Sequence, residues 1–253
     1  PVCVFALQAV YGDFLFILLV GVMSTRFCFY APNLLSDLDT RSGGIFMQQN
    51  KTKTLVTCGM LIALASILSI FPKIDGIWPN GGSITFCSML PIIIISYLYG
   101  LKWGFMSSFA FALIQLFTGI KGIAGMDALT TFLVILIDYI IAFTILGIGG
   151  IFRGKFNNPA KELAAGSALA IFLRFVSHFA SGYLLYSSYA EWFFTQEGFT
   201  LGNNIFASLG DGTALYVLYS VMYNGSYLLP ELVITTIVAY IIGKQKFFKD
   251  LMK

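Results

Sequence analysis

Long apolar stretches alternate with short polar segments from residue 47 to the end of the chain. A helix that crosses a bilayer needs about 20 mostly apolar residues, because hydrocarbon offers no hydrogen-bonding partner to an open backbone group. The pattern therefore predicts membrane-spanning helices joined by short loops. The six predicted spans are residues 54–71, 84–100, 103–119, 128–151, 163–188 and 213–243, of which the second is short.

The amino-acid composition supports the same conclusion. Charged residues make up 11% of the chain and hydrophobic residues 58%, with a mean hydropathy of +0.84, whereas a soluble domain carries roughly a quarter charged residues. The cysteines form no CxxC pair, a lone His178 cannot build a His-rich metal site, and the HExxH and GxSxG motifs are absent. We expect an all-α integral membrane protein, a six-helix transmembrane bundle, with no cofactor and no enzymatic activity.

Residues 1–46 fit this plan poorly. They hold one apolar stretch near residues 2–22 and then a polar segment from Asn33 to Gly44. One interpretation is a seventh helix or a signal sequence, although no basic region precedes the apolar stretch. The interpretation we favour is that Met47 is the natural start. Residues 1–46 are then an upstream segment outside the native fold, and residues 47–253 form the transmembrane domain.

The distribution of basic residues over alternate loops predicts the orientation, since cytoplasmic loops retain positive charge. One face collects Lys51, Lys53, Lys102, Arg153, Lys155, Lys161, Lys244, Lys246, Lys249 and Lys253, and the other has Lys73 and Lys121 beside Asp75, Asp127, Glu191, Glu197 and Asp211. Both ends of residues 47–253 are therefore predicted to be cytoplasmic, in a multi-pass protein of the bacterial cell membrane. The acidic outer mouth favours a cationic solute.

Four ionisable residues lie inside predicted spans: Asp138, Arg174, His178 and Glu231. Charge within a span costs several kcal/mol, so each is a candidate for function. Asp138 either pairs with Arg174 of the next helix or, as we favour, faces a bound cation. Arg174 and His178 are four residues apart and share a helix face, which continues to Gly182 and Tyr186. A core histidine bonded to a carbonyl, and an arginine extended toward the basic interface, remain alternatives.

The last span carries a polar stripe. Asn224, Tyr227 and Glu231 are spaced by three and four residues, with Tyr219 and Tyr223 close by. Asn224 can bond helix to helix, as such residues often do in membranes, or offer its carboxamide to a heterocycle as donor and acceptor together. Glu231 follows a proline, and we interpret it as a structural residue that bonds backbone groups freed by that proline.

Together, these spans supply a carboxylate, a histidine, a carboxamide and several aromatic rings below an acidic mouth that includes Trp78. The ligand that suits them best is a flat cation with hydrogen-bonding edges. Each ring contributes about 0.5–2 kcal/mol by cation–π contact, and a carboxylate offsets a charge that the ligand cannot lose. Residue chemistry alone does not name this ligand.

Several segments occur in a characteristic order and spacing. They are Gly81-Gly82-Ser83-Ile84-Thr85 leading to Met89-Leu90-Pro91-Ile92, Asp138-Tyr139 followed by residues 146–153, residues 174–182, and residues 219–231. In these segments the chain resembles the thiamine-specific substrate-binding subunits, or S components, of energy-coupling factor (ECF) transporters. The resemblance covers nearly all of residues 55–243.

The resemblance implies a set of positions at which family members contact thiamine. These are Trp78, Asp138, Tyr139, His178, Tyr186, Tyr219 and Asn224, and we interpret Arg174, Tyr223 and Glu231 as a second layer around them. Asp138 replaces a glutamate and Tyr186 replaces a stacking tryptophan. We expect these two differences to alter affinity rather than ligand class.

The chain has no GxxxxGK[ST] motif, and the family it resembles has no ATPase of its own, so the resemblance implies that energy for transport comes from partners. The resemblance implies a transmembrane coupling protein and two cytosolic ATPases as partners, besides thiamine and the lipid bilayer, with no nucleic acid. Docking is expected through Gly59 and Ala63, whose spacing lets helices approach closely; ordinary packing inside the subunit is the alternative. A proton-coupled secondary transporter using Asp138 and Glu231, a membrane enzyme with His178 as base, and an S component for another vitamin are the competing functions.

Overall fold

The computed structural model describes residues 46–74, 82–119 and 125–250. The chain divides into two compact units, residues 1–56 and 57–253, and the fold and site discussed below belong to the second. The segment predicted to lie outside the native fold, residues 1–46, falls outside the described residues apart from Phe46 at the start of the first helix. In chain order the elements are α2 (Phe46–Ile70), β1 (Lys73–Ile74), β2 (Ile84–Thr85), α3 (Leu90–Tyr99), α4 (Leu101–Gly119), α5 (Ala128–Val134), the π-helix η2 (Ile135–Ile141), α6 (Ala142–Thr144), the 3₁₀-helix η3 (Ile145–Gly150), α7 (Pro159–Leu185), η4 (Ser187–Tyr189), α8 (Ala190–Phe194), α9 (Thr200–Leu209), α10 (Thr213–Lys244) and α11 (Lys246–Asp250).

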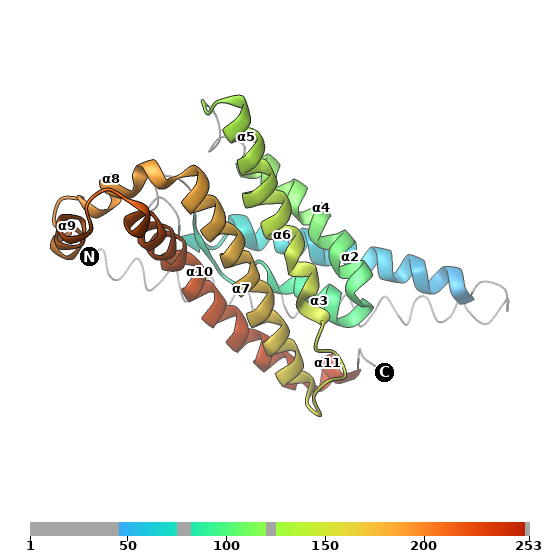
Figure 1. The fold of residues 1–253 in the computed structure, drawn as a ribbon. Helices are drawn as coiled ribbons and strands as arrows, with labels where there is room; N and C mark the ends of the chain where they lie inside the picture. Colours follow the sequence, from blue (N-terminus) through green and yellow to red (C-terminus); the bar gives the residue numbers. More distant parts are fainter. Residues whose placement is uncertain (1–45, 75–81, 120–124, 251–253) are drawn as a thin grey trace, which may run out of the picture. The chain divides into compact units, whose positions relative to one another are not determined.

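Five helical segments of the described chain are long and apolar enough to cross a membrane. They are Lys51–Ile70, Leu101–Gly119, Ala128–Gly150, Pro159–Leu185 and Thr213–Lys244. Each of them agrees with a predicted span to within four residues at either end. The predicted fold class, an all-α membrane bundle, is confirmed (Figure 1).

The second predicted span, residues 84–100, is not one long helix. Its first two residues form β2, which pairs antiparallel with β1, and α3 covers ten residues. Ten residues of helix rise about 15 Å, half the hydrocarbon thickness of about 30 Å. The chain turns between strand and helix at Cys87, whose φ is 59°, a conformation that apolar character does not reveal. The predicted count of six spanning helices is therefore not confirmed, since α3 is too short to count by length.

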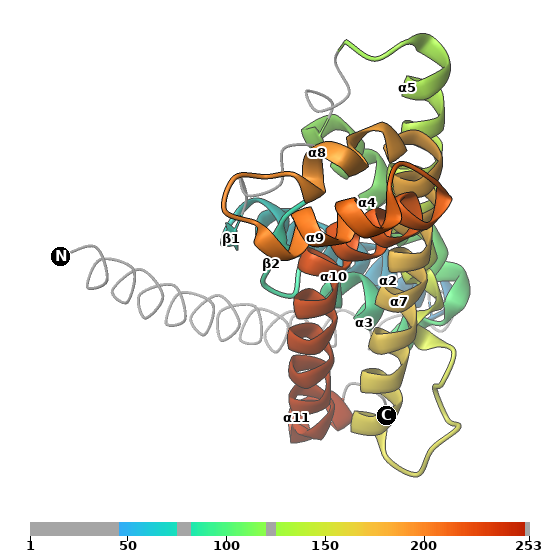
Figure 2. The same ribbon diagram turned by 60° about the vertical axis from the view of Figure 1, so that its left-hand side comes forward.

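Helices α7 and α10 pack along each other, and α7 also packs on α3, η2 and η3 (Figures 1 and 2). Asn158 caps the start of α7, where its Oδ1 accepts a 3.0 Å hydrogen bond from Ala160 N, and Pro159 occupies the first turn. Near the end of α7, a Cβ added to Gly182 would lie 2.8 Å from Asn224 Nδ2 in α10. The absence of a side chain at Gly182 therefore permits the close approach of the two helices.

The glycine-rich segment after Asp138 is a packing motif. Residues Ile145–Gly150 form the 3₁₀-helix η3, which packs on α3, α4 and α7. Gly150 N donates a 3.0 Å hydrogen bond to Ser96 Oγ in α3, and a Cβ added to Gly166 of α7 would collide with the carbonyl of Gly149. These contacts hold the span Ala128–Gly150, and with it Asp138, against α7.

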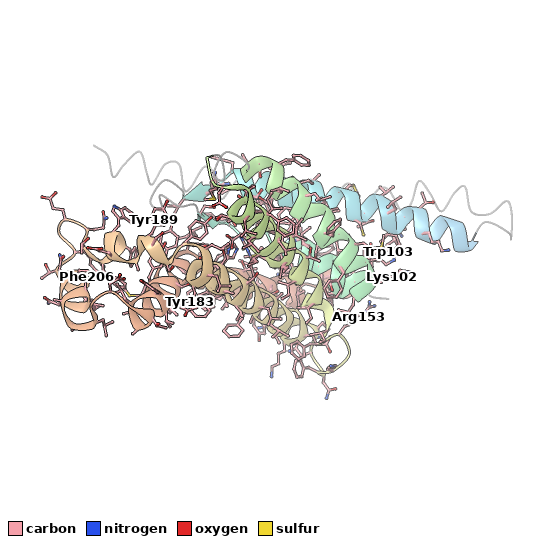
Figure 3. The ribbon with its side chains drawn as sticks, turned by 45° about the horizontal axis from the view of Figure 1, so that its top comes forward. Lys102, Trp103, Arg153, Tyr183, Tyr189 and Phe206 are labelled. Atoms are coloured by element: carbon pink, nitrogen blue, oxygen red, sulfur yellow. The ribbon has the colours of Figure 1, made fainter. Side chains whose placement is uncertain are left out.

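Basic side chains gather at one end of the helix bundle. Figure 3 shows Lys102 and Arg153 at this end, and Tyr189 and Phe206 toward the opposite end. Arg153 Nη1 donates a 2.6 Å hydrogen bond to the carbonyl of Leu98, which ties the segment before α7 to the end of α3. The acidic residues Glu191, Glu197 and Asp211 lie in the segments that follow the other end of α7. This separation agrees with the charge distribution used to predict the orientation, and the cytoplasmic location of the termini stays a prediction.

Candidate functional site

Asp138 lies in the middle of the span Ala128–Gly150, at a break in the regular α-helix. Residues Ile135–Ile141 form a π-helical turn between α5 and α6. A π turn widens the helix and changes the direction of its side chains, and such turns are frequent at functional sites. The hydrophobic pattern of this segment did not predict the turn.

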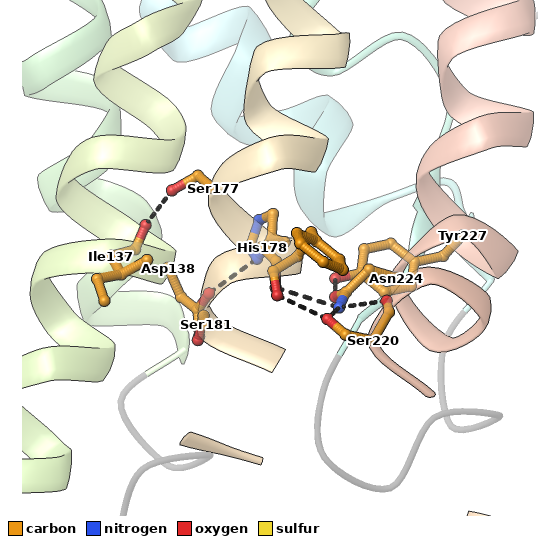
Figure 4. A network of polar contacts seen from close by, with 9 residues as sticks. Ile137, Asp138, Ser177, His178, Ser181, Ser220, Asn224 and Tyr227 are labelled. Atoms are coloured by element: carbon orange, nitrogen blue, oxygen red, sulfur yellow. Dashed lines mark hydrogen bonds and ion pairs between the residues drawn. The ribbon is translucent and has the colours of Figure 1, made fainter. Parts of the chain in front are cut away.

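The carboxylate of Asp138 is held by two side chains of α7. His178 Nδ1 lies 3.0 Å from Oδ1, and Ser181 Oγ donates a 2.7 Å hydrogen bond to Oδ2 (Figure 4). Ser177, which directly precedes His178 on α7, donates a 2.8 Å hydrogen bond from its Oγ to the carbonyl of Ile137. The side chains of Asp138 and His178 are 15% and 12% exposed. Sequence reasoning missed both serines, although Ser181 follows His178 by three residues and thus shares its helix face.

Asn224 connects His178 to α10. Its Nδ2 donates to the carbonyl of His178 at 3.1 Å and to that of Ser220 at 3.0 Å, and its Oδ1 accepts a 2.7 Å hydrogen bond from Tyr227 OH (Figure 4). The ring of Tyr227 stands edge-on to His178, with centroids 6.2 Å apart. Asn224 therefore forms a helix-to-helix hydrogen bond, which was one of the two alternatives that the sequence offered for it. A ligand contact stays a prediction, since an amide oxygen can accept a second hydrogen bond.

His178 has one nitrogen engaged and one without a partner. Nδ1 faces the Asp138 carboxylate, which favours a proton on that nitrogen. Nε2 is buried and has no hydrogen-bond partner among the described residues. Buried polar atoms in proteins are almost always paired, with protein, a ligand or an ordered water, so Nε2 is free to accept a hydrogen bond from any of these. The alternative of a core histidine whose side chain bonds a carbonyl is wrong, because the side chain bonds a carboxylate.

Arg174 pairs with Glu231 and not with Asp138. Its Nη1 lies 3.7 Å from Glu231 Oε2 and 2.9 Å from Met89 Sδ, and the guanidinium stacks 4.2 Å above the Phe143 ring. The Asp138–Arg174 ion pair, one of the two interpretations of Asp138, is therefore wrong. Extension of Arg174 toward the basic interface is wrong too, because its side chain is 11% exposed and is held inside the bundle.

Glu231 is almost completely buried, with 1% of its side chain exposed. Besides Arg174, its carboxylate accepts a hydrogen bond from Thr85 Oγ1, whose oxygen also lies 2.6 Å from Ser88 Oγ. We expected Glu231 to bond backbone groups freed by the preceding proline. Its described side-chain partners instead come from α7 and from the segment around β2, so it joins three parts of the bundle.

The tyrosines of α10 belong to an aromatic cluster in the first half of the helix. Tyr219 is 1% exposed, and its ring centroid lies 5.5 Å from that of Tyr223. Phe193 of α8 contacts both rings edge-on, with centroids 5.5 Å from Tyr219 and 6.0 Å from Tyr223. Tyr223 in turn contacts Tyr227 at 6.4 Å. Phe193 was missed from the sequence, where it stands in an aromatic segment with no recognisable pattern.

The remaining predicted contacts differ in position. Tyr139 OH donates a 3.2 Å hydrogen bond to the carbonyl of Gly119, so this side chain points toward α4. Tyr186 directly follows α7 and packs against the buried cluster that contains Tyr219 and Tyr223. Trp78 lies outside the described residues. The structure thus brings Asp138, His178 and Asn224 together, and places Tyr186 on the neighbouring aromatic cluster. The ligand contacts of all these residues stay predictions.

The residues predicted for partner docking lie on the outer side of α2. Gly59 and Ala63 are exposed, and a Cβ added to Gly59 would have no atom within 4 Å. Ile67 and Ile70 continue this face, with 58% and 57% of their surfaces exposed. Ordinary packing of the pair inside the subunit is therefore wrong for the described residues. A stripe of α2 made of these four residues is open to lipid or to another protein.

Comparison with known proteins identifies the family of this chain. The sequence profile of the thiamine transporter protein family (Thia_YuaJ) matches residues 55–215. The chain belongs to the thiamine transporter family. Membership places it among transporters rather than enzymes and, together with the apolar helices, indicates a multi-pass membrane protein.

Two individual proteins are similar to this thiamine transporter family member, one in sequence and one in structure. Thiamine transporter ThiT of Bacillus subtilis (strain 168) is 27% identical over 200 residues, which cover 76% of this chain and 90% of that protein. A solved structure of ThiT from Listeria monocytogenes superimposes with a TM-score of 0.57 at 19% identity, covering 80% of this chain and 98% of that one. At this identity the structural likeness supports the fold alone.

Proposed function

We propose that this chain binds thiamine within the membrane, with Asp138 as the counter-charge of the thiazolium ring, and that it is the substrate-binding subunit of an ECF-type importer. The observation that carries the proposal is the Asp138 carboxylate, held on a π turn by His178 and Ser181 in a chain of the thiamine transporter family. Thiazolium is a permanent cation, so a dry site must balance its charge.

The charges of the four ionisable groups at and next to the site favour a cationic ligand. Arg174 is neutralised by Glu231, whereas the ion-pair partner of Asp138 within the described residues is His178, which can be neutral. With a neutral histidine, these groups sum to one negative charge. A single thiazolium ring would balance it, and an anionic or neutral vitamin would not.

The neighbouring side chains suit the rest of thiamine. His178 Nε2 is a buried atom that can accept a hydrogen bond from an amino group. The rings of Tyr186, Tyr219 and Tyr223 offer π-faces, each contributing about 0.5–2 kcal/mol to a cation. Asn224 and Ser181 hold the histidine and the carboxylate in place, so that little ordering is left to occur on binding.

The test is a binding titration of purified chain carrying Asp138→Asn. The substitution keeps the shape of the side chain and removes its charge, so thiamine affinity should fall by about 2–5 kcal/mol, as for breaking a buried charge pair. A thiamine analogue with an uncharged ring should lose much less. Glu197→Gln, at an exposed acidic residue of the outer end, is the control for a general change of charge and should bind as the parent does.

Two results would contradict the proposal. Equal losses for thiamine and the neutral analogue would show that Asp138 supports the fold and does not balance the ligand charge. A parent chain that binds riboflavin or biotin in preference to thiamine would assign the site to another vitamin.

The exposed α2 stripe supports the ECF part of the proposal. A coupling protein can approach the helix closely at Gly59 and Ala63, where no bulky side chain intervenes. Energy would then come from two cytosolic ATPases that associate with the coupling protein. The competing function, proton-coupled secondary transport, predicts that vesicles containing this chain alone take up thiamine when a proton gradient is applied. Such uptake would reject the ECF proposal.

A further inference from the structure

The Arg174–Glu231 ion pair lies next to the candidate site on both helices that form it. Arg174 is four residues before His178 on α7, and Glu231 is four residues after Tyr227 on α10. Four residues of α-helix rise about 6 Å. The pair is therefore a charged layer one helical turn from the network that holds Asp138.

Glu231 supplies the charge that neutralises Arg174. The other described contacts of the guanidinium are the sulfur of Met89 and the ring of Phe143, neither of which carries a charge. An arginine does not lose its proton in a protein. Without the Glu231 carboxylate, a full positive charge would remain one turn from Asp138.

Such a charge would oppose a cationic ligand. It could turn toward Asp138 and compete for the carboxylate, or it could act through space. For an assumed separation of about 8 Å, a little more than one helical turn, two unit charges at an effective dielectric constant of about 20 interact strongly enough to change an affinity about 30-fold. The interaction is expected to be strong here because the side chains of Arg174 and Asp138 are 11% and 15% exposed, so salt screens them poorly.

We propose that Glu231 is a positioning residue for ligand binding: by holding Arg174, it reserves the Asp138 carboxylate for the cationic ligand. This inference rests on the proposed function, because it requires a cation at Asp138. Thr85, which donates a hydrogen bond to Glu231, helps to fix the carboxylate toward Arg174. Glu231 thus sets the charge selectivity of the site without touching the ligand.

The test compares thiamine with a neutral-ring analogue on purified full-length chain in detergent, by calorimetric titration. Glu231→Gln should weaken thiamine binding about 30-fold and leave the neutral analogue nearly unchanged. The double variant Glu231→Gln, Arg174→Gln removes both charges and should restore thiamine binding to within about threefold of the parent. Thr85→Val, which removes the hydrogen bond and keeps the carboxylate, is the matched control and should weaken thiamine much less than Glu231→Gln does.

Rescue by the second substitution separates a charge effect from loss of structure. A Glu231→Gln variant that binds thiamine like the parent, or that loses both ligands equally, overturns the inference. If that variant does not fold, the double variant decides alone, and a loss of tenfold or more in thiamine affinity then overturns it. Failure of the proposed function looks different: the parent itself would not bind thiamine, or Asp138→Asn would have no effect.

Discussion

Gly182→Ala should weaken both the packing of α7 on α10 and thiamine binding. A Cβ at this position would lie 2.8 Å from Asn224 Nδ2, 3.2 Å from Ser220 Cβ and closer still to Ser220 Oγ. Carbon atoms in contact normally stay about 3.5–4 Å apart, so the helices must separate or the side chains of α10 must move. Asn224 is the side chain that bonds the carbonyl of His178, so the displacement would reach the site.

The magnitude follows from two opposing terms. Inserting a methyl group into a well-packed interface costs about 1–3 kcal/mol, whereas replacing glycine by alanine in a helix gains about 1 kcal/mol of helix propensity. Stability should therefore fall by up to about 2 kcal/mol. Loss of the Asn224 hydrogen bond to the His178 carbonyl should weaken thiamine by about 0.5–1.5 kcal/mol, or up to about tenfold.

The matched control is Gly225→Ala on the facing helix. A Cβ there would lie 3.4 Å from Leu229 Cδ1, an ordinary van der Waals contact, so this variant should be as stable as the parent or more stable. Thermal unfolding in detergent and a thiamine titration measure the two effects. A Gly182→Ala variant that behaves like Gly225→Ala in both assays would refute the argument that close approach at Gly182 positions Asn224.

Two further predictions concern other parts of the chain. Phe193→Leu should weaken thiamine binding by about 0.5–1.5 kcal/mol for each edge-on ring pair that Phe193 forms with a site tyrosine. The control Phe199→Leu should have little effect, because the described ring neighbours of Phe199 are phenylalanines. Equal losses for the two variants in the titration would indicate general loosening of the aromatic cluster. Gly59→Leu combined with Ala63→Leu should abolish uptake of labelled thiamine by cells while the purified chain binds it normally. Normal uptake would remove this face of α2 from the docking surface, and failure to bind would place the pair inside the fold.

The sequence by itself determined the spans and the set of candidate residues. Hydropathy is a local property, because the requirement for an internally hydrogen-bonded, apolar helix applies to each segment separately. The five long spans were therefore predicted to within a few residues. Asp138, His178 and Glu231 were identifiable for the same reason: a charge or a histidine in an apolar stretch requires a partner wherever the helices pack.

The identity of each partner was decided by the tertiary structure. The sequence left Asp138 with Arg174 as a possible partner, and the helix packing instead places Arg174 against Glu231 and Asp138 against His178 and Ser181. The choice depends on the rotation of each helix and on its level in the bundle. Both are set by contacts between segments distant in sequence, such as the close approach at Gly182, and no single apolar stretch encodes them.

Backbone geometry was likewise settled by packing. The π turn that carries Asp138 and the left-handed residue Cys87, which precedes the shortened second helix, leave no trace in an apolar pattern. Both are local backbone conformations that neighbouring segments stabilise. The sequence therefore determined which residues could form a site for a cation, and the tertiary structure determined that the Asp138 carboxylate has no arginine as its partner within the described residues.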